Sequence, residues 1–412
     1  MRRPPQRTSV AGFSLVELMV AITIALAASL AIFQTYASSE ERKRTTTSGS
    51  EGLQAGVFAL ASLQRSIINA GYNLGVISDA GYTSPVRQIT PGGVYTLSTT
   101  NPPTPEFHIG CTATIGGQPV RVAPLIATDG GNGIASDTLV IFSGNSANVP
   151  LPIGTETGGV AAGVATVRLR STFGFAVGDW VLVYEQSAVI NAGTARPRAC
   201  TFARVTALPN APAFSPADIV LSVPTAAAYD TPMVINMGPN PTLESWTVDA
   251  NGRLTVTDLI NNTPGQVIAE NVVSMQVQLG IDVGNDDVVD EWINPPAAAG
   301  TWLNPPNPMP ENQITAALPV PGGARSLNQV KAVRVGLLVR SPQFERPDDA
   351  GNCTTTPAGP AQVLPAVAGA LANRLPDMPS SGNYMLAGDQ RCFRYNTVSS
   401  LIPVRNVVLS EM

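Results

Sequence analysis

The sequence "AGFSLVELMVAITIALAASLAIF", Ala11–Phe33, carries one ionisable side chain, Glu17, in a run that is otherwise uncharged and mostly apolar. No charged residue occurs from Leu18 to Ser39, and about 20 such residues allow a helix to cross the hydrocarbon core of a bilayer. Charge returns immediately afterwards in "EERKR" at 40–44. The stretch therefore predicts a membrane-spanning helix with a carboxylate near its start.

Two ordinary explanations leave part of this pattern unexplained. A cleaved secretory signal has an apolar core of roughly 7–15 residues that ends at small residues, and this run is longer. A simple single-pass anchor explains the length but not Glu17, because a charge at the centre of a spanning helix costs about 3 kcal/mol on insertion scales. A third interpretation uses the glycine, the glutamate and the residues before them together.

The motif "GFSLVE", from Gly12 to Glu17, follows a short leader with three arginines and resembles the cleavage motif of type IV prepilins and pseudopilins. The resemblance implies that a peptidase of the inner membrane cuts after Gly12 and that Phe13 becomes the methylated amino terminus. Glu17 is then the fifth residue of the mature chain. It would pair with the charged terminus of a neighbouring subunit, or with its own, because a buried carboxylate needs such a partner.

The segment after the charged cluster leaves open whether the helix is continuous. "TTTSGS" at 45–50 contains poor helix formers, and "SGSE" at 48–51 has the form of a capping box, so a second helix could begin there. A helix that continued through residues 13–70 would be about 87 Å long. Gly71 is a plausible stop. An apolar stripe at spacings of three and four predicts packing against the head, and it consists of Leu53, Val57, Leu60, Leu63 and Ile67.

The remainder of the chain alternates short apolar runs with turn residues, which predicts a β-rich domain. Strand signals occur at 179–185, 272–282, 331–340 and 392–409. The second of these alternates apolar and polar residues, so we expect it to be a half-buried strand. A helical signal is clear only around 361–375.

Composition excludes several classes of function. Net charge is −5 across 412 residues with no large basic block, so nucleic acid is not an expected partner. Only 13% of residues are charged, while 37 are Gly and 36 are Pro, a balance typical of β-rich extracytoplasmic domains. The single histidine, His108, has no obvious partner, and no nucleophile elbow or phosphate-binding loop occurs. We therefore expect no enzymatic activity and no required cofactor.

The four cysteines, Cys111, Cys200, Cys353 and Cys392, contain no C-x-x-C pair and fit no zinc-site spacing. In a domain outside the cytoplasm they would form two disulfides. Three connectivities are possible, and the sequential one, which closes the shortest loops, is favoured. Four buried free thiols are the alternative.

An acidic segment, "IDVGNDDVVDEW" at 281–292, partly follows the spacing of an EF-hand calcium loop. The calcium ligands would be Asp282, Asp286, Asp290 and the carbonyl of Val288. Gly284 stands where a third ligand side chain belongs, and Ile293 stands where a bidentate glutamate belongs. A calcium site and a plain acidic turn both remain open, and the plain turn is favoured.

The later motifs, taken in order, resemble the PilW family of minor pilins. These motifs are "LQRSIINAGY" at 63–72, "FAVGDWVLV" at 175–183, the acidic segment, "VKAVRVGLLVRS" at 330–341 and "VRN" at 404–406. The resemblance implies an α+β, type IV pilin-like fold in which a long amino-terminal helix packs on a large antiparallel β-rich head. It divides the chain into a leader at 1–12, a transmembrane and assembly helix at 13–39, an amphipathic second half of the helix at 40–71, and a head at 72–412.

The implied function is that of a minor pilin with no reaction of its own. It would enter the inner membrane as a single-pass prepilin with its head in the periplasm, and later join the pilus fibre at the cell surface. Its partners would be prepilin peptidase, other minor pilins, the major pilin and the inner-membrane assembly machinery, with which it would prime or cap the fibre. Two alternatives are a pseudopilin of a type II secretion system and a pilus-tip adhesin, whose ligand site would lie within residues 85–160.

Overall fold

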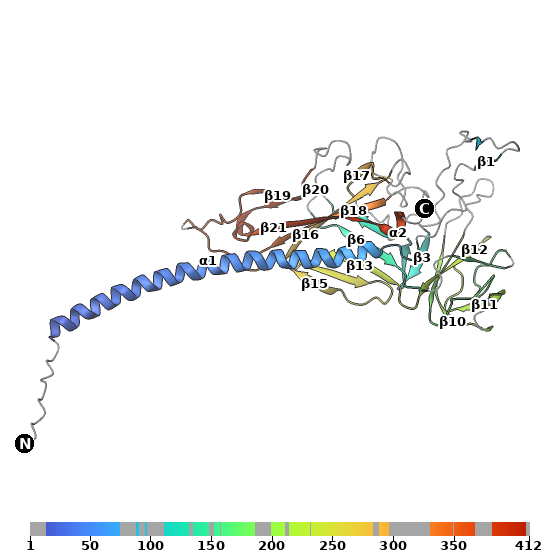
Figure 1. Cartoon of the computed structure of the whole chain (residues 1–412), viewed down its shortest axis with the longest axis horizontal. Coiled ribbons are helices and arrows are strands. Elements are labelled where there is room, and N and C mark those ends of the chain that lie inside the picture. The colour runs from blue at the N-terminus through green and yellow to red at the C-terminus, as the bar shows by residue number, and fades with distance from the viewer. Residues whose placement is uncertain are drawn as a thin grey trace, which may run out of the picture.

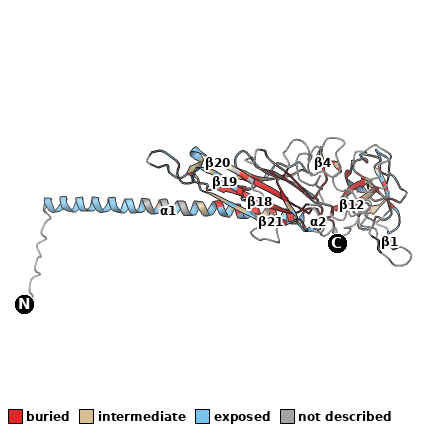
Figure 2. Ribbon diagram, turned by 90° about the horizontal axis from the view of Figure 1, so that it is seen from above, coloured by how far each residue is buried: buried red, intermediate tan, exposed pale blue. Residues whose placement is uncertain are grey.

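The structure is a computed structural model that joins one long helix to an antiparallel β head (Figure 1). It describes residues 14–74, 88–89, 95–96, 111–131, 135–147, 152–156, 158–185, 199–210, 214–230, 232–282, 288–295, 330–348, 350–366 and 381–408. The helix leaves the head at one end, and its exposed first half extends away from it (Figures 1 and 2). The expected α+β fold, a long amino-terminal helix on a large antiparallel β domain, is confirmed.

Helix α1 runs from Leu15 to Asn69 as 55 residues without interruption. It therefore passes through the threonines and glycine at 45–50, and no second helix begins at the capping-box sequence. Packing of the following turns on the head outweighs the weak helix propensity of these residues. The helix ends where Gly71 adopts φ +77°, a left-handed conformation that favours glycine, and the Gly71 N–H donates to the carbonyl of Phe142 at 2.8 Å.

The described strands form three larger sheets and three hairpins. The five-stranded sheet has the order β15 (Gln266–Glu270), β14 (Arg253–Asp258), β13 (Thr242–Val248), β6 (Thr138–Ser143), β5 (Leu125–Thr128). The four-stranded sheet has the order β17 (Glu291–Ile293), β16 (Val272–Ile281), β18 (Val330–Arg340), β21 (Tyr395–Pro403), after which α2 spans Arg405–Val408. The hairpins are β1 (Gln88–Ile89) with β2 (Tyr95–Thr96), β3 (Thr112–Ile115) with β4 (Gln118–Arg121), and β19 (Gly359–Leu364) with β20 (Ser381–Leu386), which precedes the 3-10 helix Gly388–Cys392.

A six-stranded sheet closes on itself at the end of the head that lies farthest from the amino terminus (Figure 1). Its order is β7 (Ile153–Gly154), β12 (Pro232–Gly238), β9 (Trp180–Glu185), β10 (Thr201–Ala207), β11 (Ala217–Leu221), β8 (Thr166–Leu169). Thr155 bridges to Leu169, and the N–H of Arg170 donates to Gly154 at 3.0 Å, so the first and last strands meet. We call this closed sheet the barrel; it is inserted in the chain between β6 and β13.

The barrel has its own core and is also packed firmly on the rest of the head. Val181, Val183 and Val234 point into the barrel core, whereas Leu182 and Ile235, their neighbours along the strands, belong to the main core. This alternation follows from the period of two in a β-strand. At the junction, the ring of Phe202 on β10 stacks on Trp180 at 4.6 Å and meets the edge of Phe142 on β6 at 5.8 Å.

The buried face of α1 differs from the expected stripe in its first two turns. Leu60, Leu63 and Ile67 are buried as expected, but Leu53 and Val57 are 43% and 53% exposed. Glycines take their place against the head. A Cβ at Gly52 would lie 2.8 Å from the Arg340 carbonyl oxygen, and a Cβ at Gly56 would lie 3.0 Å from Val339. The contact surface was predicted wrongly there, because an apolar pattern cannot show that a helix backbone itself meets a strand.

Two strand expectations also need correction. β16 is buried on both faces rather than half-buried, because its polar side chains at Ser274, Gln276 and Gln278 lie beneath other parts of the head. They are accommodated by hydrogen bonds, for example from Gln276 Nε2 to the Ala135 carbonyl at 2.8 Å. The helical signal at 361–375 is wrong over 361–364, because these residues belong to β19. Leu364 of β19 packs closely on β18: a Cβ at Gly336 would lie 2.6 Å from its side chain.

Asp137 links the five-stranded sheet to the open side of β16. Its N–H donates to the Met275 carbonyl at 2.8 Å, and its carboxylate accepts from the N–H of Val277 at 2.7 Å and of Gly130 at 3.2 Å. The Ser136 hydroxyl accepts from the N–H of Met275 at 3.0 Å. Burial raises the pKa of the Asp137 carboxyl from 3.8 to about 7, and the backbone donors counteract only part of this shift.

A first prediction concerns the close approach of α1 to the head. Gly52→Ala should lower the free energy of unfolding by about 1–3 kcal/mol, because its Cβ would overlap a backbone oxygen that cannot move alone. Gly49→Ala is the matched control, since the nearest atom, Arg394 Cδ, is 3.9 Å away; it should gain up to about 1 kcal/mol from helix propensity. Denaturant unfolding of the detergent-solubilised chain measures both, and equal effects would contradict the packing account.

A second prediction concerns pH. Because the folded pKa of Asp137 is raised, the folded state holds its proton more tightly than the unfolded state does. Its contribution to stability is complete below about pH 4 and is lost as pH rises toward 7, with a slope of at most about 1.4 kcal/mol per pH unit. Unfolding measured from pH 4 to 8 should show this slope in the wild type and lack it in Asp137→Asn. An unchanged slope in the variant would refute the assignment.

Candidate assembly surface

The first half of α1 is an exposed apolar rod. The helix from Leu15 to Tyr36 is long and apolar enough to cross a membrane, and none of it is buried against the head. Its polar side chains bond within the helix: the hydroxyl of Thr23 donates to the Val20 carbonyl at 2.9 Å, and that of Ser29 donates to Ala25 at 2.8 Å. These hydroxyl groups therefore need no hydrogen-bond acceptor from lipid or from a neighbouring helix.

Glu17 lies in the first turn of α1 and is the only charged side chain in residues 14–36. The carboxylate is exposed and has no hydrogen-bond or ion-pair partner among the described residues. Negative charge is favoured in the first helical turn because the unpaired N–H groups there carry partial positive charge. Gly12 and Phe13, the predicted cleavage residues, lie outside the described residues, so their processing remains a prediction.

The second half of α1 lies along β21 and runs in the same direction. Gly49 is near Arg394 and Gly56 is near Val398. Just after the carboxyl-terminal end of α1, the side-chain amide of Asn406 donates to the carbonyl of Ala70 at 2.9 Å. Any force on the exposed half of the helix is therefore transmitted to the head through a contact that spans the whole strand.

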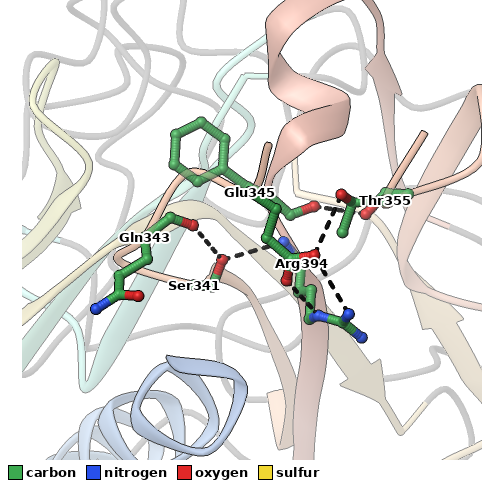
Figure 3. A network of polar contacts seen from close by, with 7 residues as sticks. Ser341, Gln343, Glu345, Thr355 and Arg394 are labelled. Atoms are coloured by element: carbon green, nitrogen blue, oxygen red, sulfur yellow. Dashed lines mark hydrogen bonds and ion pairs between the residues drawn. The ribbon is translucent and has the colours of Figure 1, made fainter. Parts of the chain in front are cut away.

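A polar network surrounds the start of β21, close to α1 (Figure 3). The Ser341 hydroxyl donates to the Gln343 carbonyl at 3.1 Å and accepts from the N–H of Arg394 at 3.1 Å. Arg394 also pairs with Glu345, whose carboxylate accepts from Thr355 at 3.3 Å. The ion pair is partly exposed and contributes little by itself, so the network mainly fixes the path of the chain between β18 and β21.

Both disulfides have the sequential pairing. Cys353 and Cys392 are joined with Cα atoms 4.7 Å apart, next to the polar network, and the Glu345 N–H donates to the Cys392 carbonyl at 2.8 Å. Cys111 and Cys200 are joined with Cα atoms 5.6 Å apart and connect the strand β3 region to the start of β10 in the barrel. One crosslink therefore holds the loops beside α1, and the other ties the barrel to the head.

The acidic segment connects β16 to β17. Asp282 is fully buried at the end of β16, and the N–H of Asp290 donates to the Ile281 carbonyl at 2.8 Å. Val288 is described and exposed, whereas Asp286 lies outside the described residues. No group of three or more metal-binding side chains occurs among the residues that the structure describes, so a calcium site here remains a prediction.

Comparison with known proteins agrees with the arrangement at both ends of the chain. Residues 248–406 match the model of the family described as Type IV Pilus-assembly protein W, PilW, and residues 7–33 match that of the prokaryotic N-terminal methylation motif. No curated protein and no solved structure matches the chain. The matches confirm the resemblance to PilW-like minor pilins and support a type IV pilus-related pilin, a structural protein associated with the membrane.

The barrel lies outside both matched regions, and the sequence reasoning missed it. Of its strands only the one at 179–185 was expected. The turn residues between its short strands gave a general β signal, but closure depends on Thr155 meeting Leu169, two residues from opposite ends of the sheet. Such a pairing is not encoded in any local pattern.

Proposed function

We propose that this chain is a minor pilin that primes or caps a type IV pilus as part of a minor-pilin complex. The observation that carries the proposal is the single helix α1, whose exposed apolar half continues without a break into the spine of the head. Such a helix can rest in the inner membrane and later pack among the helices of a fibre while the head remains folded. The protein performs no reaction of its own.

The same proposal sets out its route of maturation. Prepilin peptidase removes residues 1–12, Phe13 becomes the methylated terminus, and the head stays on the periplasmic side until assembly. The partners are other minor pilins, the major pilin and the inner-membrane assembly machinery. The amino-terminal methylation-motif match at 7–33 supports this order of events, since it covers the cleavage residues and the start of α1.

A deletion strain tests the proposal. Loss of surface pili or of twitching motility, with type II secretion intact and with recovery on expression of the full chain, is the expected result. Loss of secretion with normal piliation would instead identify a pseudopilin of a type II secretion system and overturn the proposal.

A tip adhesin is the second candidate, and the barrel favours it, with a ligand site on the barrel rather than within the expected residues 85–160. The barrel lies at the far end of the head from the membrane helix and outside the regions matched to known families (Figure 1). It exposes two stacked rings, Phe173 and Phe214, whose centroids are 4.2 Å apart. Phe173→Ala combined with Phe214→Ala should reduce attachment and leave piliation unchanged if this candidate is correct; unchanged attachment would count against it.

A further prediction concerns Glu17. Glu17→Ala should leave membrane insertion and cleavage intact but reduce incorporation into pili about tenfold or more, because the carboxylate no longer meets the amino terminus of a neighbour. Thr23→Ala is the matched control, since Thr23 bonds within its own helix. Quantitative immunoblotting of sheared pili against total membrane protein gives the ratio, and equal incorporation of Glu17→Ala and wild type would contradict this role.

Calcium binding at the acidic segment is a separate proposal. Two carboxylates, Asp282 and Asp290, flank the connection between β16 and β17, and EF-hand spacing also places Asp286 among the ligands. Titration calorimetry on the chelator-treated chain should then show heat with calcium, and Tm should rise by several degrees. Asp286→Asn should remove both effects. If calcium produces neither heat nor a Tm shift in the wild type, the calcium proposal is contradicted.

A further inference from the structure

Strand β21 forms a long, regular and uncharged edge of the four-stranded sheet. It pairs with β18 at nine consecutive positions, from Tyr395 opposite Arg340 to Pro403 opposite Ala332, with no shift of register. The nine residues, "YNTVSSLIP", contain no charged side chain. An edge of this kind is a template on which another extended segment can pair, unless charge, proline or a bulge prevents it.

The hydrogen bonds at the two ends of β21 identify which backbone groups face the open side. The Ser341 N–H donates to the backbone carbonyl of Arg394 at 2.7 Å, and the Val404 N–H donates to the backbone carbonyl of Lys331 at 2.9 Å. In an antiparallel ladder, residues bond to the partner strand at alternate positions. The even-numbered residues therefore bond to β18, and the odd-numbered residues 395–403 direct their N–H and C=O groups outward; Pro403 has no N–H to offer.

These outward groups have no partner within the described chain. No hydrogen bond involves the backbone of Thr397, Ser399 or Leu401 on the open side, and each of the three residues is exposed. Their side chains lie on the face opposite α1, because Val398 and Ile402 face the helix. The outward N–H and C=O groups of these three residues are therefore open to pairing with a further strand.

The other edges of the larger sheets in the described part of the head are short, irregular or closed, and each strand of the β19–β20 hairpin has only six residues. β5 has four residues and β17 has three, which leaves little length for pairing. β15 has five residues, ends in Glu270, and pairs with its neighbour through a shifted register. The barrel closes and has no free edge. β21 stands apart from them in length, regularity and lack of charge.

Resting on the proposed function, we propose that the open edge of β21 receives an extended, uncharged segment of a different pilin subunit as an additional antiparallel strand. Main-chain hydrogen bonds supply the affinity in this mode of recognition, and the alternating side chains supply selectivity. Thr397, Ser399 and Leu401 present two hydroxyls and one apolar side chain, which suit small or β-branched partners across the strand.

The direction of α1 excludes β21 of a second copy as the occupant. α1 and β21 run in the same direction, as the contacts from Gly49–Arg394 to Ala70–Asn406 show. Antiparallel pairing of two β21 strands would therefore set the two α1 helices antiparallel. Two subunits anchored in one membrane by the same end of α1 cannot adopt that arrangement. The incoming segment must run toward the membrane, opposite to α1.

Site-specific photo-crosslinking in membranes of the native host tests this inference. A benzophenone side chain at Thr397 of the full chain should crosslink to an extended segment of another pilin, identified by mass spectrometry of the joined peptides. Thr166, exposed on β8 of the barrel, is the control position. Ser399→Pro should lower the Thr397 crosslink about tenfold, because it removes one outward N–H and leaves the bonds to β18 in place. Ser399→Ala, which keeps that N–H, should not lower it.

Four outcomes would overturn the inference: no crosslink from Thr397, equal yields at Thr397 and Thr166, a yield unaffected by Ser399→Pro, or joining to β21 of a second copy. Equal Tm values for the wild type and the variants would show that a lost crosslink reflects lost pairing and not lost folding. Leu401→Lys repeats the test without proline, because it adds a charge to the edge. Incorporation of the chain into pili is measured in the same strains. If the chain is found in pili but gives no crosslink from Thr397, only this inference is contradicted. If the chain is absent from pili, the proposed function is contradicted.

Discussion

The close approach of α1 to β18 and β21 at Gly52 and Gly56 is the contact on which the rest of the molecule depends. Absence of a side chain lets the helix meet the Arg340 backbone at Gly52 and the side chains of Val339 and Val398 at Gly56, so the helix packs closely on β18 and β21. The same helix is an exposed apolar rod from Leu15 to Tyr36, and after Gly56 it buries one face, with Leu60, Leu63 and Ile67, in the core of the head. One element thus couples the position of the membrane segment to the orientation of the head.

The head around this spine has two kinds of part. The four-stranded sheet and strands β14 and β15 of the five-stranded sheet fall within the region matched to the PilW family, and β15, β18 and β21 of this region contact α1. The barrel is inserted between β6 and β13 and shares the main core through its outer face. The Cys111–Cys200 disulfide reinforces that junction. The matched region thus holds the strands that contact α1, while the barrel lies at the far end of the head.

Sequence alone predicted what is encoded locally: the apolar helix with Glu17, the class of head, and strands such as β9 and β18. Long-range features were missed. Leu53 and Val57 fit a helical stripe but face solvent, because the glycines beside them meet the sheet. Gln276 and Gln278 look solvent-facing but are covered by segments distant in sequence. The processing residues Gly12 and Phe13 and the calcium ligand Asp286 lie outside the described residues and remain predictions.

We propose that α1 is first the membrane helix of a prepilin and then packs in an assembled pilus. This change requires cleavage that leaves a defined amino terminus. Mass spectrometry of the chain purified from membranes and from pili measures that terminus directly. The account predicts a chain that starts at Phe13 with one added methyl group in both fractions. A chain that retains Met1, or one cut near Ala37, would contradict it, because α1 would then lack either the processed terminus or the apolar half that carries Glu17.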